Sequence, residues 1–223
     1  MKNNLIWDKI FKYKGWGKYP AEDLVRFIVK NFNKKKKKSK INILEIGCGP
    51  GGNLSYFAKE GFNIYGLDFS LVAIQKANKN LDKNYPKWRG KLIRADILSH
   101  NFNKNKFDAI IDNEMSCCLS LNQTTNVYKK LFKSLKKKGK IFLRTFSTKS
   151  FGYKTGKKIG YNRYLPLFGA KKMGPQRFST SRDIDQIFKK NYKILSKEII
   201  SRTINKQQNM ISEWIVEVEK KNV

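Results

Sequence analysis

The chain has 223 residues, of which 40% are hydrophobic, and this length and composition suit one globular domain with a sizeable core. No stretch approaches the roughly 20 apolar residues of a membrane-spanning helix, and charges interrupt the N-terminal segment before a signal-peptide core can form. Three cysteines without a C-x-x-C spacing provide neither a disulfide framework nor a zinc site, so we expect a cytoplasmic protein without a bound metal.

The formal net charge of +31 permits two interpretations. A strongly basic surface is typical of proteins that bind nucleic acids or anionic membranes. However, only eight of the 48 basic residues are arginines, which phosphate and base recognition favours, and the chain is rich in asparagine and isoleucine. Lysine, asparagine and isoleucine are the residues that an AT-rich genome over-supplies, so the lysine excess is better explained by this compositional bias. An RNA partner stays the alternative.

The first 40 residues are predicted to form an N-terminal helical cap and a lysine-rich linker. Aromatic residues are spread through residues 5–19, and Pro20 with the acids Glu22 and Asp23 then provides the start signals of a helix. The lysine run at residues 34–38 is most simply a solvated linker.

From residue 41, short apolar runs alternate with helical patterns, which is the signature of βαβ units and a parallel sheet. The predicted strands are residues 41–46, 62–67, 91–94, 107–112 and 140–146, and the predicted helices are residues 53–60, 71–80 and 123–137. A helix at 180–190 precedes two β-rich runs, 192–200 and 210–218, which should pair antiparallel because no helix separates them. We expect one α/β domain over residues 41–223, with a Rossmann-like, seven-stranded, mostly parallel sheet whose last strand is antiparallel.

Residues 147–178 interrupt this alternation with glycines, prolines and aromatics, and the segment is too long for an ordinary connection. We interpret it as an insertion and candidate substrate lid, with Tyr161 and Tyr164 as substrate contacts. The alternative is a peripheral loop whose aromatics pack on the sheet edge. Arg144 and Arg177, which flank the insertion, are candidates for binding a substrate carboxylate or phosphate, although a surface position is commoner for arginine.

Three glycines with the spacing G-x-G-x-x-G follow the first predicted strand and precede a helix: Gly47, Gly49 and Gly52. They let the backbone turn tightly and approach a ligand at the helix N-terminus, and on this spacing alone a dinucleotide fold is equally possible. Glu45, inside the strand, favours a ligand with an ammonium group over a pyrophosphate. Asp68 ends the second strand, where an acid can accept hydrogen bonds from ribose hydroxyls, and Asp96 follows the third, where an acid can accept from an adenine amine.

These motifs, in this order, resemble those of class I S-adenosylmethionine-dependent methyltransferases. The resemblance covers residues 41–219 and rests on residues 43–51 (ILEIGCGPG), 66–70 (GLDFS), 95–97 (ADI) and 107–112 (FDAIID). It implies S-adenosylmethionine as the cofactor, with the glycines at the methionine moiety, Asp68 at the ribose, and Phe69, Asp96 and Ile97 around the adenine. The residues predicted to bind the cofactor are Glu45, Gly47, Cys48, Gly49, Gly51, Asp68, Phe69, Asp96, Ile97 and Asn113, with Trp16 and Tyr19 as a cap or as core residues. The alternatives for Glu45 and Asp96 are a satisfied core acid and a turn cap.

A sulfonium methyl group is already activated, so the main task of such an enzyme is to align a nucleophile, and positioning alone supplies on the order of 7–11 kcal/mol. A base, where the acceptor needs one, is predicted to be Asp112 or Glu114 at the carboxyl end of the fourth strand. Methyltransferases of nucleic-base amines carry Asn/Asp-Pro-Pro-aromatic after this strand, whereas residues 112–115 read Asp-Asn-Glu-Met here. This departure disfavours exocyclic amines of nucleic acids as acceptors.

We therefore expect methyl transfer to an oxygen or nitrogen of a small molecule, such as a sugar nucleotide or another anionic metabolite. Residues 16–20 (WGKYP), with Glu22 and Arg26, are similar to bacterial methyltransferases encoded with surface-polysaccharide genes. Two alternatives stay open: an RNA methyltransferase that uses the lysine surface, and a non-catalytic partner subunit that keeps the cofactor fold. The oligomeric state is not indicated.

Overall fold

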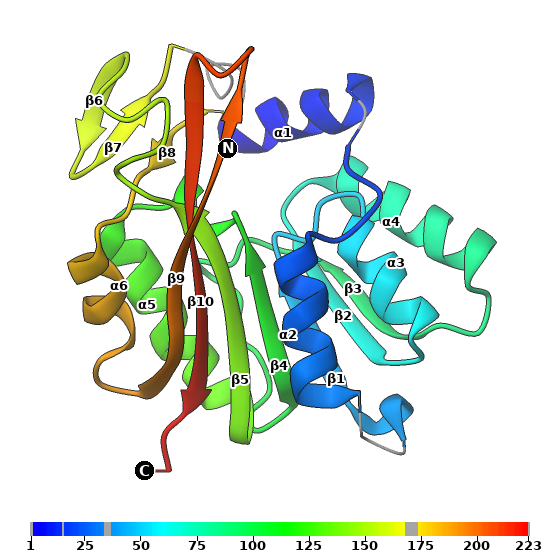
Figure 1. Cartoon of the computed structure of the whole chain (residues 1–223). Coiled ribbons are helices and arrows are strands. Elements are labelled where there is room, and N and C mark those ends of the chain that lie inside the picture. The colour runs from blue at the N-terminus through cyan, green and yellow to red at the C-terminus, as the bar shows by residue number, and fades with distance from the viewer. Residues whose placement is uncertain (1, 15, 34–36, 168–173, 223) are drawn as a thin grey trace.

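The computed structural model describes residues 2–14, 16–33, 37–167 and 174–222, and its central element is a seven-stranded sheet (Figure 1). Residues 34–36 of the predicted linker and 168–173 of the predicted insertion lie outside this description. The strand order is β3-β2-β1-β4-β5-β10-β9. The strands are β1 Asn42–Ile46, β2 Asn63–Asp68, β3 Arg89–Arg94, β4 Phe107–Asn113, β5 Leu135–Phe146, β9 Tyr192–Ile204 and β10 Asn209–Lys220.

The pairs among β1 to β5 are parallel, and β10 pairs antiparallel with both β5 and β9. This arrangement confirms the predicted Rossmann-like sheet with an antiparallel last strand. In the part of the chain that the structure describes, no helix is long and apolar enough to cross a membrane.

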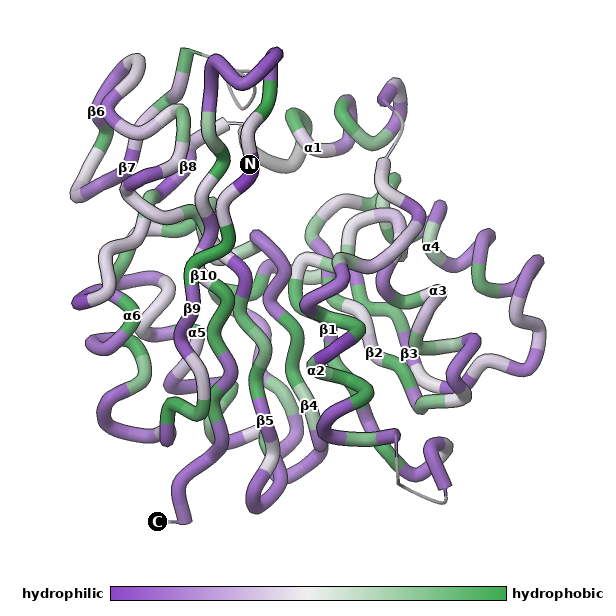
Figure 2. Tube along the Cα trace, viewed as in Figure 1, coloured by the Kyte–Doolittle hydropathy of each residue, from purple (hydrophilic) through white to green (hydrophobic). Residues whose placement is uncertain are grey.

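Helices cover both faces of the sheet (Figure 1). One face is covered by α2 Glu22–Phe32, α3 Gly52–Lys59 and α4 Leu71–Asn84, and the other by α5 Leu121–Ser134 and α6 Ser181–Phe188. Neighbouring strand residues point to opposite faces, so Ile43 packs with the first group of helices and Leu44 with the second. In Figure 2, hydrophobic residues are concentrated in the central strands, and hydrophilic and hydrophobic residues alternate along the helices.

Helix α5 is shorter than predicted, because the segment after it joins the sheet. Its start has a capping box, in which the Ser120 side chain accepts from the backbone of Gln123 and the Gln123 side chain accepts from the backbone of Ser120. Its end at Ser134 precedes Leu135, which pairs with Phe107, and the Lys136 ammonium lies 2.6 Å from an Asp108 carboxylate oxygen. The prediction that this helix continues to residue 137 is therefore wrong.

The insertion forms a small antiparallel sheet instead of a structureless loop. Its strands are β6 Lys157–Gly160, β7 Arg163–Leu165 and β8 Gln176–Arg177. Under it, the ring centroids of Tyr153, Tyr164 and Phe178 lie 5.6–6.3 Å apart. These three aromatic residues thus pack on one another, and the small sheet lies at the carboxyl edge of the main sheet (Figure 1).

Helix α1, Lys2–Tyr13, lies across the same edge and contacts α4 (Figure 1). An Asp8 carboxylate oxygen accepts from the Ser70 hydroxyl and, at 3.2 Å, from the backbone N–H of Val72, which caps the start of α4. The Lys76 ammonium donates to the backbone carbonyl of Phe11. These contacts fasten α1 above the glycine turn.

Candidate active site

The glycine turn follows β1, where the order of the sheet reverses between β1 and β4. Ligands of open α/β sheets bind outside the carboxyl ends of the strands at such a point. The backbone N–H groups of Gly47 and Cys48 donate to the Leu67 carbonyl at 2.7 and 3.1 Å, which holds the turn against β2. Gly47 has φ +66°, and a Cβ there would lie 2.4 Å from Cγ of Met115, so a side chain does not fit.

A pocket of about 630 Å³ opens at this edge, a volume usual for sites that bind small molecules. It extends from the glycine turn, past the end of β4, to the insertion and the tip of the β9–β10 hairpin. Eleven of the residues predicted to bind a cofactor line it: Trp16, Tyr19, Glu45, Gly47, Cys48, Gly49, Asp68, Phe69, Asp96, Ile97 and Asn113.

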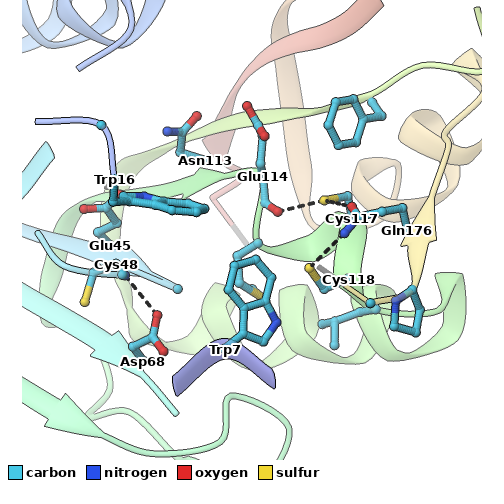
Figure 3. Close-up of a pocket in the computed structure, with 18 of the residues that line it drawn as sticks. Trp7, Trp16, Glu45, Cys48, Asp68, Asn113, Glu114, Cys117, Cys118 and Gln176 are labelled. Carbon is cyan, nitrogen blue, oxygen red and sulfur yellow. Dashed lines mark hydrogen bonds between the residues drawn. The ribbon is translucent and has the colours of Figure 1, made fainter. Parts of the chain in front are cut away.

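Glu45 is 3% exposed and points into the pocket beneath Trp16 (Figure 3). One carboxylate oxygen accepts from the Asn53 side-chain amide at 2.6 Å, whereas the other is buried without a partner among the described residues. Burial, and secondarily the carboxylates of Asp68 and Asp112, raise the pKa of Glu45 to about 8. A buried carboxylate oxygen without a donor is costly, so the site is built for a ligand that brings one.

Asp68 lies below Cys48 at the end of β2 (Figure 3). Its two carboxylate oxygens accept from the backbone N–H groups of Gly49 and Ser70 at 2.9 and 2.8 Å. Burial raises the pKa of Asp68, although these hydrogen bonds oppose the shift. Asp96 also lines the pocket while its Oδ1 accepts from the backbone N–H of Leu98 at 2.9 Å, so it has the geometry of a turn cap as well.

Gly51 is the one residue of the predicted cofactor set that lies outside the pocket lining. It has φ +86° at the start of α3, and a Cβ there would lie 3.0 Å from the Cβ of Ala77. Its carbonyl accepts from the Ser55 hydroxyl at 3.0 Å. Gly51 therefore permits the close contact of α3 with α4, and Gly52 takes a place in the lining instead.

Glu114 follows β4 and stands between the two ends of the pocket (Figure 3). Its backbone adopts φ +65°, held by a hydrogen bond from its N–H to the Arg144 carbonyl at 2.9 Å. A carboxylate oxygen of Glu114 lies 3.5 Å from Nε of Arg144, which also makes a two-pronged ion pair with the buried Glu213 of β10. Burial and the Glu213 carboxylate raise the pKa of Glu114 to about 7, against the lowering effect of Arg144.

Asp112, the other predicted base, is fully buried and does not line the pocket. Its Oδ1 accepts from the backbone N–H groups of Met115 and Ser116, and its Oδ2 accepts from the Tyr128 hydroxyl at 2.8 Å. These bonds hold the turn after β4. The prediction of Asp112 as a base is therefore corrected, and Glu114 is the remaining candidate.

The four predicted substrate contacts also lie outside the pocket lining. Arg144 is held by Glu213, and Arg177 is 1% exposed and donates to the Leu119 carbonyl and to the hydroxyls of Ser179 and Thr124. Tyr161 is 59% exposed and Tyr164 is packed in the aromatic cluster of the insertion. Both guanidinium groups are engaged in an ion pair or hydrogen bonds within the chain, so neither is available to a substrate anion.

The individual wall residues of the second half of the pocket were not predicted from the sequence, although the insertion that supplies several of them is the segment interpreted above as a candidate substrate lid. The apolar walls of this half come from the turn after β4, the end of β5, the insertion and β10: Met115, Leu119, Phe146, Phe151, Phe178 and Ile211. Gln176 lies there beside Cys117 and Cys118 (Figure 3), and the Cys117 thiol donates to the Gln176 side-chain carbonyl at 3.0 Å. The position of Phe146 at the carboxyl end of a predicted strand was the one available signal.

The sequence matches the profile of a family described as "Methyltransferase domain" over residues 37–212. Among curated proteins it is similar to a sterol 24-C-methyltransferase of Kluyveromyces lactis (31% identity, 44% of this chain, 26% of that protein). It is also similar to O-methyltransferase 3 of Dictyostelium discoideum (28%, 82% and 43%). The chain thus spans well under half of these two relatives. A tRNA N(3)-methylcytidine methyltransferase of Schizosaccharomyces pombe matches at 25% identity over 93% of this chain and 68% of that protein.

Solved structures show the same fold. A SAM-dependent methyltransferase of Methanosarcina mazei superposes with a TM-score of 0.71 at 16% identity, covering 92% of this chain and 99% of that one. Magnesium protoporphyrin IX methyltransferase of Synechocystis gives 0.68 at 12% identity, covering 99% and 98%. Because the family profile covers most of the sequence and the fold agrees, the chain belongs to the methyltransferase domain family.

Proposed function

We propose that the chain transfers a methyl group from S-adenosylmethionine to an oxygen or nitrogen of a small-molecule acceptor. One observation carries this proposal: a single pocket joins the half lined by the glycine turn, Glu45 and Asp68 to a separate apolar half, with Glu114 between them. A donor site and an acceptor site that share one pocket are what direct group transfer requires. Family membership supports the same reaction class.

The residues of the first half, which we call the donor half, fit S-adenosylmethionine. The unpartnered carboxylate oxygen of Glu45 can accept from the ammonium group of its methionine moiety. The carboxylate of Asp68 can exchange its backbone donors for ribose hydroxyls, and Phe69 and Ile97 offer apolar contact for the adenine. When bound, this donor supplies an activated methyl group. We also propose that residues 1–40 act as a cap, since Trp7 and Trp16 cover the donor half.

Glu114 is the residue we assign to proton transfer. As the acceptor atom attacks the sulfonium methyl, a new bond to carbon forms and the electron pair of the S–CH₃ bond returns to sulfur. The proton that the acceptor must lose passes to the Glu114 carboxylate, whose pKa of about 7 suits a base at neutral pH. The buried Arg144–Glu213 pair holds this carboxylate in place.

Incubation of the protein with methyl-labelled S-adenosylmethionine and a cell extract tests the proposal. The extract is separated afterwards into small-molecule, RNA and protein fractions. We expect the label in the small-molecule fraction, and much less transfer by an Asp68→Ala variant at a donor concentration below saturation. Label confined to RNA or protein would contradict the small-molecule proposal.

An RNA acceptor is the second candidate, since the tRNA-modifying relative aligns with nearly the whole chain and the surface is strongly basic. The pocket does not favour it, because none of the lysines of the described chain lines the pocket. In the same experiment, label in the RNA fraction would establish this second candidate.

A further inference from the structure

We infer that the acceptor is an aromatic molecule without a phosphate group, whose hydroxyl or amine hydrogen faces Glu114. This inference rests on the proposed methyl transfer and names its substrate class. It replaces the sugar nucleotide or anionic metabolite expected from the sequence.

The charge of the pocket is opposite to that of the protein. The chain carries 48 basic residues against 17 acidic ones, yet among the described residues the charged ones that line the pocket are four acids and one arginine: Glu45, Asp68, Asp96, Glu114 and Arg202. Nearby Arg144 and Arg177 are tied to internal partners. Arg202 is thus the one cationic side chain among the described residues of the lining, so a phosphate group would meet four acids and a single arginine instead of the several cations by which proteins hold phosphates.

The walls of the second half, which we call the acceptor half, are those of a site for an aromatic ring. Phe146 and Phe178 lie with ring centroids 5.9 Å apart and an interplanar angle of 37°, and Phe151 and Met115 also line the space. Aromatic rings and a thioether pack favourably against a flat apolar ligand. Sugars, in contrast, need several polar partners for their hydroxyls.

The acceptor half has few polar side chains, and Gln176 already makes hydrogen bonds within the chain. Gln176 is 2% exposed and its amide is shared between Cys117 and Cys118. Among the described residues that line the acceptor half, Glu114 provides a carboxylate that can accept a hydrogen from the acceptor. A hydroxyl and an amine both supply such a hydrogen, so the two acceptor chemistries share one geometry.

Cys118 provides a readout of ligand binding that does not depend on turnover. It lines the acceptor half, and hydrogen bonds with Cys117 and Gln176 lower the pKa of its thiol. Cys48 lines the donor half, where burial raises the pKa of its thiol well above the usual value. Iodoacetamide should therefore alkylate Cys118 faster than Cys48, and a ligand in the acceptor half should protect Cys118.

The experiment measures the alkylation rate of Cys118 by mass spectrometry in protein saturated with S-adenosylhomocysteine. The probes are 1-naphthol, 1-naphthylamine and UDP-glucose at equal millimolar concentrations. We expect at least one aromatic probe to slow alkylation about tenfold, as mass action gives for roughly 90% occupancy, and UDP-glucose to leave the rate unchanged. Protection by UDP-glucose, or by neither aromatic probe, would overturn the inference. Transfer of labelled methyl to naphthol or naphthylamine then separates hydroxyl from amine acceptors.

Two variants test whether the protection arises at Cys118 and at the aromatic wall of the acceptor half. Cys118→Ser identifies the labelled residue, and Phe151→Ala removes part of the aromatic wall and should abolish most of the protection. Calorimetric binding of S-adenosylhomocysteine checks that each variant is folded. If S-adenosylhomocysteine does not bind the wild type, the proposed function fails; if it binds but the aromatic probes give no protection, the inference alone fails.

Discussion

Two glutamates in the pocket, Glu45 and Glu114, have pKa values of about 8 and about 7, far above the usual 4.5. Burial is the main cause for both, because it disfavours the charged form. Near neutral pH, a modest change in the surroundings of either glutamate is therefore enough to change its protonation state. In the proposed reaction, that change is the arrival of the donor's ammonium group for Glu45 and the loss of a proton by the acceptor for Glu114.

Binding of S-adenosylhomocysteine should release a proton from Glu45. Its pKa of about 8 means that roughly nine in ten molecules hold the proton at pH 7 before binding, and pairing with the ligand ammonium lowers that pKa. Calorimetry in buffers of different ionisation enthalpy should show release of close to one proton at pH 7. A Glu45→Gln variant should release almost none, whereas the control Glu60→Gln should behave as the wild type. Equal release from wild type and Glu45→Gln would refute this role.

The rate of methyl transfer should rise with pH through about 7 as Glu114 loses its proton. Glu114→Gln should remove this rise and lower the rate by about 10²–10⁴, the usual contribution of a general base. Glu213→Gln removes a neighbouring negative charge, so the midpoint should move to lower pH. The rate profile of the labelled acceptor checks both, with Glu198→Gln as the matched control. A pH-independent rate in the wild type would rule out Glu114 as the base.

For residues at the ends of parallel strands, the sequence predicted the position at the pocket, while their binding roles stay predictions. Glu45 and Asp68 stand at fixed positions relative to apolar strands, and both line the pocket. Arg144 and Arg177 were placed in the substrate site wrongly, because their partners lie far away in the sequence. Glu213 was missed for the same reason, since its contact with Arg144 depends on the register of β10 with β5.

Helix α1 is the element that we propose as the cover of the donor half. The rings of Trp7, Phe11 and Trp16 lie 5.0–6.0 Å from one another, and Phe11 and Trp16 cover Gly49. The helix is fastened to α4 through Asp8, outside the pocket lining. A change at Asp8 can thus loosen the cover without removing a ligand contact.

Asp8→Ala should weaken S-adenosylhomocysteine binding about fivefold, since loss of a helix cap costs about 1 kcal/mol. The effect should fall on the dissociation rate, because the cover must open before the ligand leaves. Stopped-flow displacement measures that rate, and Lys9→Ala, an exposed neighbour on the same helix, is the control. An unchanged dissociation rate in Asp8→Ala would argue against α1 as the cover.

The main strands could be predicted from the sequence, whereas the walls of the acceptor half could not. Apolar runs between helical patterns mark buried parallel strands. The strands β6 to β8 have only two to four residues, too few for an alternating pattern to emerge. The strand predicted at residues 192–200 corresponds to β9, which continues to Ile204. The additional residues bring Arg202 to the pocket.

At the scale of the whole molecule, the net charge is +31, whereas the described residues that line the pocket include four acids and one arginine. Surface charge of this size attracts polyanions without selecting a reaction. The basic surface and the acidic pocket therefore call for separate tests.

Transfer RNA should bind through this surface charge alone. We expect its affinity to fall at least about 100-fold between about 50 and 200 mM salt, as counterion release predicts. Saturating tRNA should leave the methylation of the small-molecule acceptor unchanged, because the polyanion does not enter the pocket. Filter binding and the labelled-methyl assay measure the two quantities. Inhibition of methylation by tRNA at physiological salt would place RNA at the pocket.

Isothermal titration of S-adenosylhomocysteine into the wild type and Asp68→Ala most directly tests whether the pocket holds the methyl donor. The wild type should bind one equivalent, and Asp68→Ala should bind about 10- to 100-fold more weakly, since a hydrogen bond to a charged group contributes about 1.5–3 kcal/mol. Asp82→Ala, at an exposed helix position, should bind as the wild type does. Absence of binding to the wild type, or equal binding by wild type and Asp68→Ala, would contradict the donor site described above.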